Sequence, residues 1–208
     1  MGTASVVFII TLFLLFSSSI KKVYLAIGLI VLLALSPLAW HFLKPYQKNR
    51  IEAFINPSID PHGAGYNVSQ SKIAIGSGGI FGTGLGKGSQ SQLNFLPVAH
   101  TDFIFAGTAE STGFIGSIFL FTLLLILMIR VVNVAGLAKD DFGMYLGIGF
   151  GAMFLFQILV NIGMNMGIMP VTGIPLPFVS YGGSAMLTNM AAIGLLQSVY
   201  ARHKKINF

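Results

Sequence analysis

The sequence contains no cysteine and few charged residues, and each shortage excludes a class of function. Without cysteine, the chain has no disulfide framework, no thiolate metal site and no redox centre based on sulfur. Charged residues make up only 9% of the 208 residues, whereas 54% are hydrophobic and the mean hydropathy is +0.81. A soluble domain of this length carries more charge. The composition therefore predicts a polytopic membrane protein.

Acidic residues are scarcer than basic ones, with 6 Asp and Glu against 12 Lys and Arg, and the formal net charge is +6. A basic chain invites comparison with nucleic-acid-binding proteins, which gather Lys and Arg on one face. Here the basic residues lie between apolar runs and form no long patch. That distribution favours anchoring in membrane lipids, and we expect no nucleic-acid partner.

Five apolar runs reach or approach the ~20 residues that a helix needs to cross a hydrocarbon core of about 30 Å. They cover residues 3–20, 23–43, 114–132, 144–166 and 184–200. The runs predict an all-α integral membrane protein with about five transmembrane helices. All 208 residues are expected to form a single membrane domain.

Lysine and arginine in the short connections predict the orientation of these helices. The residues concerned are Lys21, Lys22, Arg130, Lys139, Arg202, Lys204 and Lys205. Because cytoplasmic connections are enriched in Lys and Arg, we expect these ends and the C-terminus in the cytoplasm. One long loop, residues 44–113, and the turn 167–183 then lie outside.

One carboxylate, Asp102, lies within an apolar stretch just before the third run. Partial burial would raise its pKa toward the range in which a general base works well. A carboxylate that only accepts structural hydrogen bonds would leave the same pattern. The residues alone leave both interpretations open.

A glycine-dense segment, residues 76–88, resembles a phosphate-binding loop but lacks the Walker pattern, which requires glycine at Phe81 and Ser or Thr at Gly88. Its glycines could still bring backbone N–H groups close to a pyrophosphate. The alternative is a compact loop that packs on the membrane. The spacing of the four histidines matches no helical zinc site.

The fourth run carries features of helix contact. Gly143, Gly147 and Gly151 recur at four-residue spacing, which predicts close approach of another helix. Asn161 and Asn165 follow on the same run, and such polar groups at membrane depth face protein or a watery cavity. They either form hydrogen bonds between helices or line a substrate groove.

Short motifs spread over nearly the whole chain resemble one family of membrane proteins. They are Asn56-Pro57, Asp60-Pro61 and residues 63–67, 70–79, 90–92, 100–105, 161–164 and 170–184. By these motifs the chain resembles the SEDS family (shape, elongation, division and sporulation). Residues 90–92 are more similar to its RodA branch than to its FtsW branch.

The resemblance implies a ten-helix fold of which this chain is the C-terminal half, because residues 1–4 match the middle of a family motif. It also implies a place in the bacterial plasma membrane. The implied activity is that of a peptidoglycan glycosyltransferase, which polymerises lipid II into glycan strands for rod-shape elongation. A class B penicillin-binding protein is the implied partner. As a fragment, the chain is expected to be inactive alone.

Within this resemblance, Asp102 matches the proposed catalytic aspartate. It would act as general base, or as a ligand of Mg²⁺, since such ions are held by one or two carboxylates plus substrate phosphate. The departing undecaprenyl pyrophosphate would need a cation, from Lys or Arg or from the Mg²⁺.

The residues expected to contact lipid II or the departing pyrophosphate lie in the outer loop, on the fourth run and in the turn after it. They are Lys44, Lys48, Arg50, Lys72, Lys87, His100, Thr101, Asn161, Pro170, Thr172, Ser180, Tyr181, Gly182, Gly183 and Ser184.

Two positions depart from the family pattern, and two other functions stay open. Val98 stands where members often have Glu, and Ser111 stands where a second acidic residue often follows Glu110. These departures are typical of a non-catalytic scaffold. Asparagines at membrane depth and broken helix ends near residues 170–177 also occur in transporters, which makes a lipid II flippase the other alternative.

Overall fold

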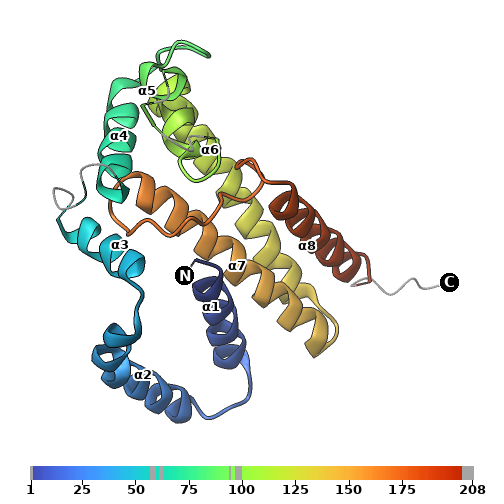
Figure 1. Cartoon of the computed structure of the whole chain (residues 1–208). Helices are drawn as coiled ribbons and strands as arrows, with labels where there is room; N and C mark the ends of the chain where they lie inside the picture. Colours follow the sequence, from blue (N-terminus) through green and yellow to red (C-terminus); the bar gives the residue numbers. More distant parts are fainter. Residues whose placement is uncertain (1, 57–59, 61–62, 94, 97–99, 203–208) are drawn as a thin grey trace.

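The protein is described by a computed structural model that covers residues 2–56, 60, 63–93, 95–96 and 100–202. Regular secondary structure within these residues is entirely α-helical, as the sequence predicts. The helices are α1 (Gly2–Ser17), α2 (Lys22–Phe42), α3 (Pro45–Ile55), α4 (Ala64–Ser77), α5 (Ser89–Gln92), α6 (Ile104–Leu137), α7 (Asp141–Asn165) and α8 (Gly183–Ala201). In Figure 1, α6 and α7 lie side by side at the centre, and α1 and α8 flank them.

Each of the five predicted membrane segments coincides with most of one helix, namely α1, α2, α6, α7 or α8. Among the described residues, α6 and α7 are long and apolar enough to cross a membrane. The apolar parts of α1 and α2 are shorter. The helical membrane class is therefore supported, while the number of five spans stays a prediction.

The predicted external loop, residues 44–113, contains α3, α4, α5 and the first turns of α6. Pro45 opens α3 at a position where a missing N–H group costs nothing. The Lys44 N–H group donates to Gln47 Oε1 at 2.9 Å and so closes the first turn. These helices are too short or too polar to stand out as apolar runs, so hydropathy shows the segment only as a loop.

The glycine repeat of α7 allows a close helix contact, as its spacing predicts. A Cβ atom on Gly147 would lie 2.7 Å from Ala135 Cβ on α6, and one on Gly143 would lie 3.1 Å from Val199 Cγ1 on α8. Any larger side chain at Gly147 would therefore push α6 away. The two small residues let the central helices approach each other.

Helix α6 is interrupted at Gly113, where φ is 68° and ψ is −162°. The glycine-rich segment fills the interruption: the N–H groups of Phe114 and Ile115 donate to Gly79 O and Ile80 O at 2.9 and 3.2 Å. In return, the N–H groups of Thr83 and Gly84 donate to Glu110 O and Ser111 O at 2.9 and 3.1 Å. This part of the segment is thus a compact loop bound to α6, while its contact with a pyrophosphate or with the membrane stays a prediction.

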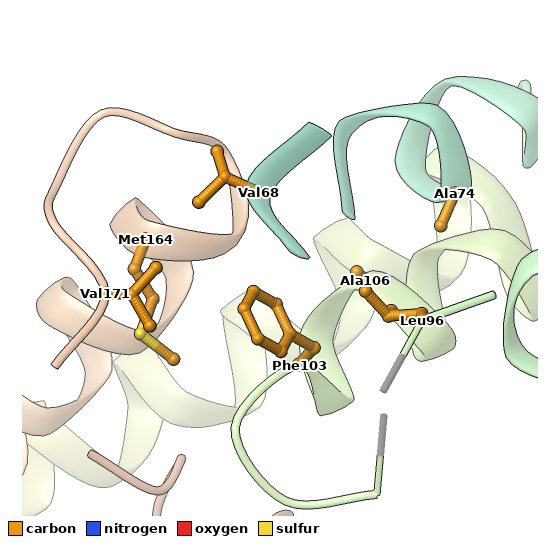
Figure 2. Packing of buried hydrophobic residues seen from close by; sticks show 7 residues of the cluster. All are labelled: Val68, Ala74, Leu96, Phe103, Ala106, Met164 and Val171. Carbon is orange, nitrogen blue, oxygen red and sulfur yellow. The ribbon is translucent and has the colours of Figure 1, made fainter. Parts of the chain in front are cut away.

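A buried apolar cluster joins α4, the start of α6 and the end of α7 (Figure 2). Its members are Val68, Ala74, Leu96, Phe103, Ala106, Met164 and Val171. Phe103 is 2% exposed, and its ring lies between Met164 and Val171 on one side and Leu96 and Ala106 on the other. Because Phe103 follows Asp102 directly, the cluster sets the position of Asp102 beside an apolar interior.

Candidate active site

Asp102 lies two residues before α6, and its backbone is held by two asparagines of α7. Asn161 Nδ2 and Asn165 Nδ2 both donate to Asp102 O, at 3.0 and 3.1 Å. Both asparagines are fully buried. Their four-residue spacing places them one above the other on one face of α7, which explains how they reach the same carbonyl group.

The same two asparagines also connect three other parts of the chain. Asn161 Nδ2 donates to Ile174 O at 2.8 Å, and Asn165 Oδ1 accepts from the Ala106 N–H group at 3.1 Å. Ser71 Oγ of α4 donates to Asn165 O at 2.7 Å. Of the two interpretations of these asparagines, the described bonds match the one in which they join helices. A buried group left without such a bond costs about 1–3 kcal/mol.

The turn between α7 and α8 holds the two residues before Asp102. Ser180 Oγ donates to Thr101 O at 2.7 Å and accepts from the Leu176 N–H group at 2.7 Å. The Tyr181 N–H group donates to His100 O at 2.9 Å. Three successive carbonyl groups, of residues 100–102, are therefore fixed by surrounding elements. A backbone held in this way fixes the direction in which the Asp102 side chain leaves it.

The Asp102 carboxylate is half-buried, and its surroundings alter its acidity. Burial raises the pKa of Asp102 above its ordinary value, and the positive charge of Arg50 offsets part of the rise. Arg50 extends from α3, and its Nη1 atom donates to Val171 O at 3.4 Å. A Cβ atom on Gly173 would lie 3.5 Å from Asp102 Oδ2, an ordinary contact distance, and the φ of +72° at Gly173 is what favours glycine there.

A groove with a volume of about 470 Å³ adjoins this segment. It is lined by His100 and Ile104 on one side and by residues 178–183 with Met186 on the other. Five residues predicted to bind substrate come together here: His100, Ser180, Tyr181, Gly182 and Gly183. Tyr181 is 80% exposed, so its ring is accessible to a ligand in the groove.

The other predicted substrate residues are distributed around this centre. Arg50 and Pro170 line a small separate pocket, and Thr172 Oγ1 contacts Met164 Sδ at 4.0 Å. Lys72 runs across Gly167, whereas Lys44, Lys87 and Ser184 are exposed at other places. Lys48 is half-buried on α3. Within the described part of the chain, Arg50 is the cation whose charge alters the pKa of Asp102.

Three buried polar residues that bind helices together were not among the predicted site residues: Ser71, Asn165 and Glu110. The sequence singles out Asn165 as a polar group on the fourth run, but Ser71 and Asn165 are 94 positions apart and share no sequence signal. The fully buried Glu110 carboxylate accepts from the N–H groups of Gln90 and Ser91, at 2.8 and 3.0 Å. It therefore binds α5 to α6.

The described residues contain no group of three or more His, Asp or Glu side chains placed to hold a metal ion. Glu110 is engaged with α5, and Val98 lies outside the described residues. Asp102 alone would suit a Mg²⁺ ion that takes most of its remaining ligands from phosphate and water.

Comparison with known proteins identifies the family. Residues 1–205 match the model of the FtsW, RodA and SpoVE proteins, described as a cell cycle protein. The chain belongs to the FtsW/RodA/SpoVE family. It is 42% identical over 208 residues to the peptidoglycan glycosyltransferase MrdB of Escherichia coli K12. The match covers all of this chain and 56% of MrdB. The chain is 49% identical over 160 residues to the peptidoglycan glycosyltransferase RodA of Treponema pallidum, covering 77% of this chain and 37% of RodA.

A solved structure shares the fold of this family member. The structure comes from work on the structural coordination of polymerization and crosslinking by a peptidoglycan synthase complex. Its matching chain has a TM-score of 0.78 and 32% sequence identity, over 99% of this chain and 56% of that chain. The chain thus spans about half the length of the relatives it matches.

Proposed function

We propose that this chain carries the catalytic residue of a peptidoglycan glycosyltransferase that polymerises lipid II into glycan strands for elongation of the cell wall. The observation that supports the proposal most is the fixed backbone of residues 100–102, which holds the half-buried Asp102 carboxylate, of raised pKa, two residues from His100 and Ile104 of the groove lining. Two relatives are named peptidoglycan glycosyltransferases.

In the proposed reaction, Asp102 removes the proton from the acceptor hydroxyl group. The oxygen then forms a bond to the anomeric carbon of the donor while the bond from that carbon to the pyrophosphate oxygen breaks. One displacement inverts the sugar carbon, converting an α-linked donor into a β-1,4-linked product. A positioned base contributes about 10²- to 10⁴-fold in rate, and the pKa raised by burial makes the Asp102 carboxylate a stronger base than an ordinary aspartate.

The leaving pyrophosphate needs positive charge. We assign this role first to Arg50, because its charge already acts on Asp102 across the site. Lys44, Lys48, Lys72 and Lys87 are further candidates in the same outer segment. In the alternative role of Asp102, the carboxylate would hold a Mg²⁺ ion that neutralises phosphate charge, instead of acting as the base. The groove residues His100, Thr101 and Tyr181, with Gly182, Gly183 and Ser184, would hold the sugar and lipid portions.

The proposal includes a location and a partner. The protein would lie in the bacterial plasma membrane with its C-terminus in the cytoplasm and residues 44–113 outside, since its short-loop basic residues follow the positive-inside rule. A class B penicillin-binding protein would be its partner. The solved chain of similar fold belongs to work on a peptidoglycan synthase complex, which supports such an assembly.

The test is lipid II polymerisation by a complete family protein that contains this chain, with Asp102→Asn introduced. The substitution keeps the shape and removes the charge, so glycan formation should fall by at least ~10²-fold. Asp141→Asn is the matched control, because this exposed carboxylate lies at the first turn of α7, away from the site. Near-normal polymerisation by the Asp102 variant would eliminate the proposed base.

The same preparation distinguishes the transport and scaffold alternatives. Movement of labelled lipid II across vesicles that is unaffected by Asp102→Asn, without any polymerisation by the unmodified protein, would favour a flippase. If the unmodified protein neither polymerised lipid II nor moved it across the vesicles, a scaffold would be favoured. The described structure favours neither: Asn161 and Asn165 donate to backbone carbonyl groups, and loop backbone fills the break in α6.

A further inference from the structure

A groove that carries both polar and apolar side chains lies between α6 and α8, near the C-terminal ends of both helices. Its volume is about 830 Å³. Arg130 and Asn133 contribute from α6, and Gln197 and Tyr200 contribute from α8. None of these residues takes part in the site around Asp102.

The polar groups form two facing pairs. Arg130 and Asn133 are three residues apart, as are Gln197 and Tyr200, so each pair lies on one face of its helix. The side chains one turn nearer the middle of the helices, Leu127 and Ile193, are apolar. The groove therefore holds a cluster of polar groups with apolar side chains on both sides of it along α6, Leu127 before the cluster and Leu137 after it.

Arg130 lies far from the Asp102 end of α6. It follows the interruption at Gly113 by 17 residues, which at ~1.5 Å per residue is about 26 Å along the continuous part of the helix. The hydrocarbon core of a bilayer is about 30 Å thick. With Asp102 at one surface of a membrane, Arg130 lies near the other surface. An Arg side chain at this depth extends its guanidinium group toward the phosphate layer.

The charge of the groove is one-sided. Its described lining residues include Arg130 but no Asp or Glu. The nearest acidic residue in sequence, Asp140, lines a different pocket between α7 and α8 together with Lys139 and Arg202. Among the described lining residues, a ligand that enters the α6–α8 groove thus meets one cation with no acidic side chain beside it, amide donors and apolar side chains.

We propose that this groove binds an anionic phospholipid of the leaflet opposite Asp102. Arg130 would bind the phosphate group, Asn133 and Gln197 would donate hydrogen bonds to the headgroup, and Leu127 and Ile193 would contact the first acyl carbons. A helix of a partner protein would fill the apolar part of the groove but would leave the Arg130 charge unmatched. For this reason the charge pattern favours a lipid.

The test measures lipid binding to the purified chain by native mass spectrometry. Dioleoylphosphatidylglycerol is compared with dioleoylphosphatidylcholine, which has the same acyl chains and no net charge. One Lys or Arg near an anionic headgroup is expected to give about a fivefold preference. Arg130→Gln should abolish that preference, and Arg130→Lys should keep most of it. A salt concentration of about 0.5 M should weaken the preference, because salt screens the attraction between Arg130 and the phosphate group.

Arg202→Gln is the matched control, since Arg202 lines the pocket between α7 and α8 and not this groove. It should leave the preference for phosphatidylglycerol unchanged. Equal binding of the two lipids to the unmodified chain would overturn the proposal. So would a loss of preference in Arg202→Gln as large as that in Arg130→Gln, because the effect would then come from general surface charge. The comparison of phosphatidylglycerol with phosphatidylcholine on the unmodified chain needs no variant, so it tests the proposal even where a variant fails to fold.

Discussion

Helices α7 and α2 are both apolar, but they have opposite surroundings. Helix α7 lies between α1 and α6 (Figure 1), and about half of its residues are buried, Asn161 and Asn165 among them. Helix α2 lies mainly against α1, and its described side chains are exposed or only partly buried. Leu, Ile and Val dominate α2, whereas α7 adds glycines and asparagines. A helix that is only apolar can therefore face lipid, whereas a helix that also carries small and hydrogen-bonding residues packs inside a bundle.

The sharpest test of this comparison is Asn165→Leu. Leucine would leave the Ala106 N–H group without its acceptor and would remove one donor to Asp102 O. We expect the free energy of unfolding to fall by about 3 kcal/mol, and polymerisation to fall with it. Thermal unfolding in detergent measures the first effect.

Gln157→Leu is the matched control on the same helix. Gln157 Oε1 is buried and has no hydrogen-bond partner among the described residues, so its loss removes no bond from that atom. We expect a change of less than about 1 kcal/mol. Equal destabilisation by the two substitutions would mean that the asparagine network does not distinguish α7.

Ser180→Ala should have the next largest effect. It removes the donor to Thr101 O and the acceptor for the Leu176 N–H group, which costs about 1–3 kcal/mol. Because the Asp102 backbone would loosen while the groove keeps its shape, kcat should fall more than KM rises. The exposed Ser198 of α8 provides a control alanine variant. A change confined to KM would contradict a positioning role for Ser180.

The smallest effect is expected on α2. Ile30 is 64% exposed, so Ile30→Ala removes few contacts within the chain. The free energy of unfolding should change by less than about 0.5 kcal/mol. A loss comparable to that of Asn165→Leu would show that α2 is as firmly held as α7, and the difference between the two helices would disappear.

Much of this arrangement can be predicted from sequence. Apolar runs locate the long helices because each run is a local property, and the glycine spacing on α7 predicts the contact at Gly147. The groove was predictable in part, because residues 180–183 are contiguous. The family follows from motifs, and the family comparison confirms it.

The remaining features depend on contacts between distant residues. No local pattern brings Ser71 to Asn165, or the carboxylate of Glu110 to the N–H groups of α5. The glycine-rich segment resembles a ligand loop, because glycine suits a close approach to a ligand and a close approach to a broken helix equally well. Its partner, Gly113, lies about thirty residues away and is recognisable only once both are folded.

The most direct test of the account is the pH dependence of kcat/KM for lipid II polymerisation by a complete family protein containing this chain. Activity requires the ionised Asp102 carboxylate, so it should fall on the acid side, at a pH above the ordinary aspartate pKa of 3.8 because burial raises the pKa. Arg50 lowers that pKa, so in Arg50→Gln the acid limb should move to higher pH. Lys139→Gln, at the far end of α6 and α7, should leave the limb in place. An acid limb that does not move in Arg50→Gln, or that persists in the residual activity of Asp102→Asn, would contradict Asp102 as the base.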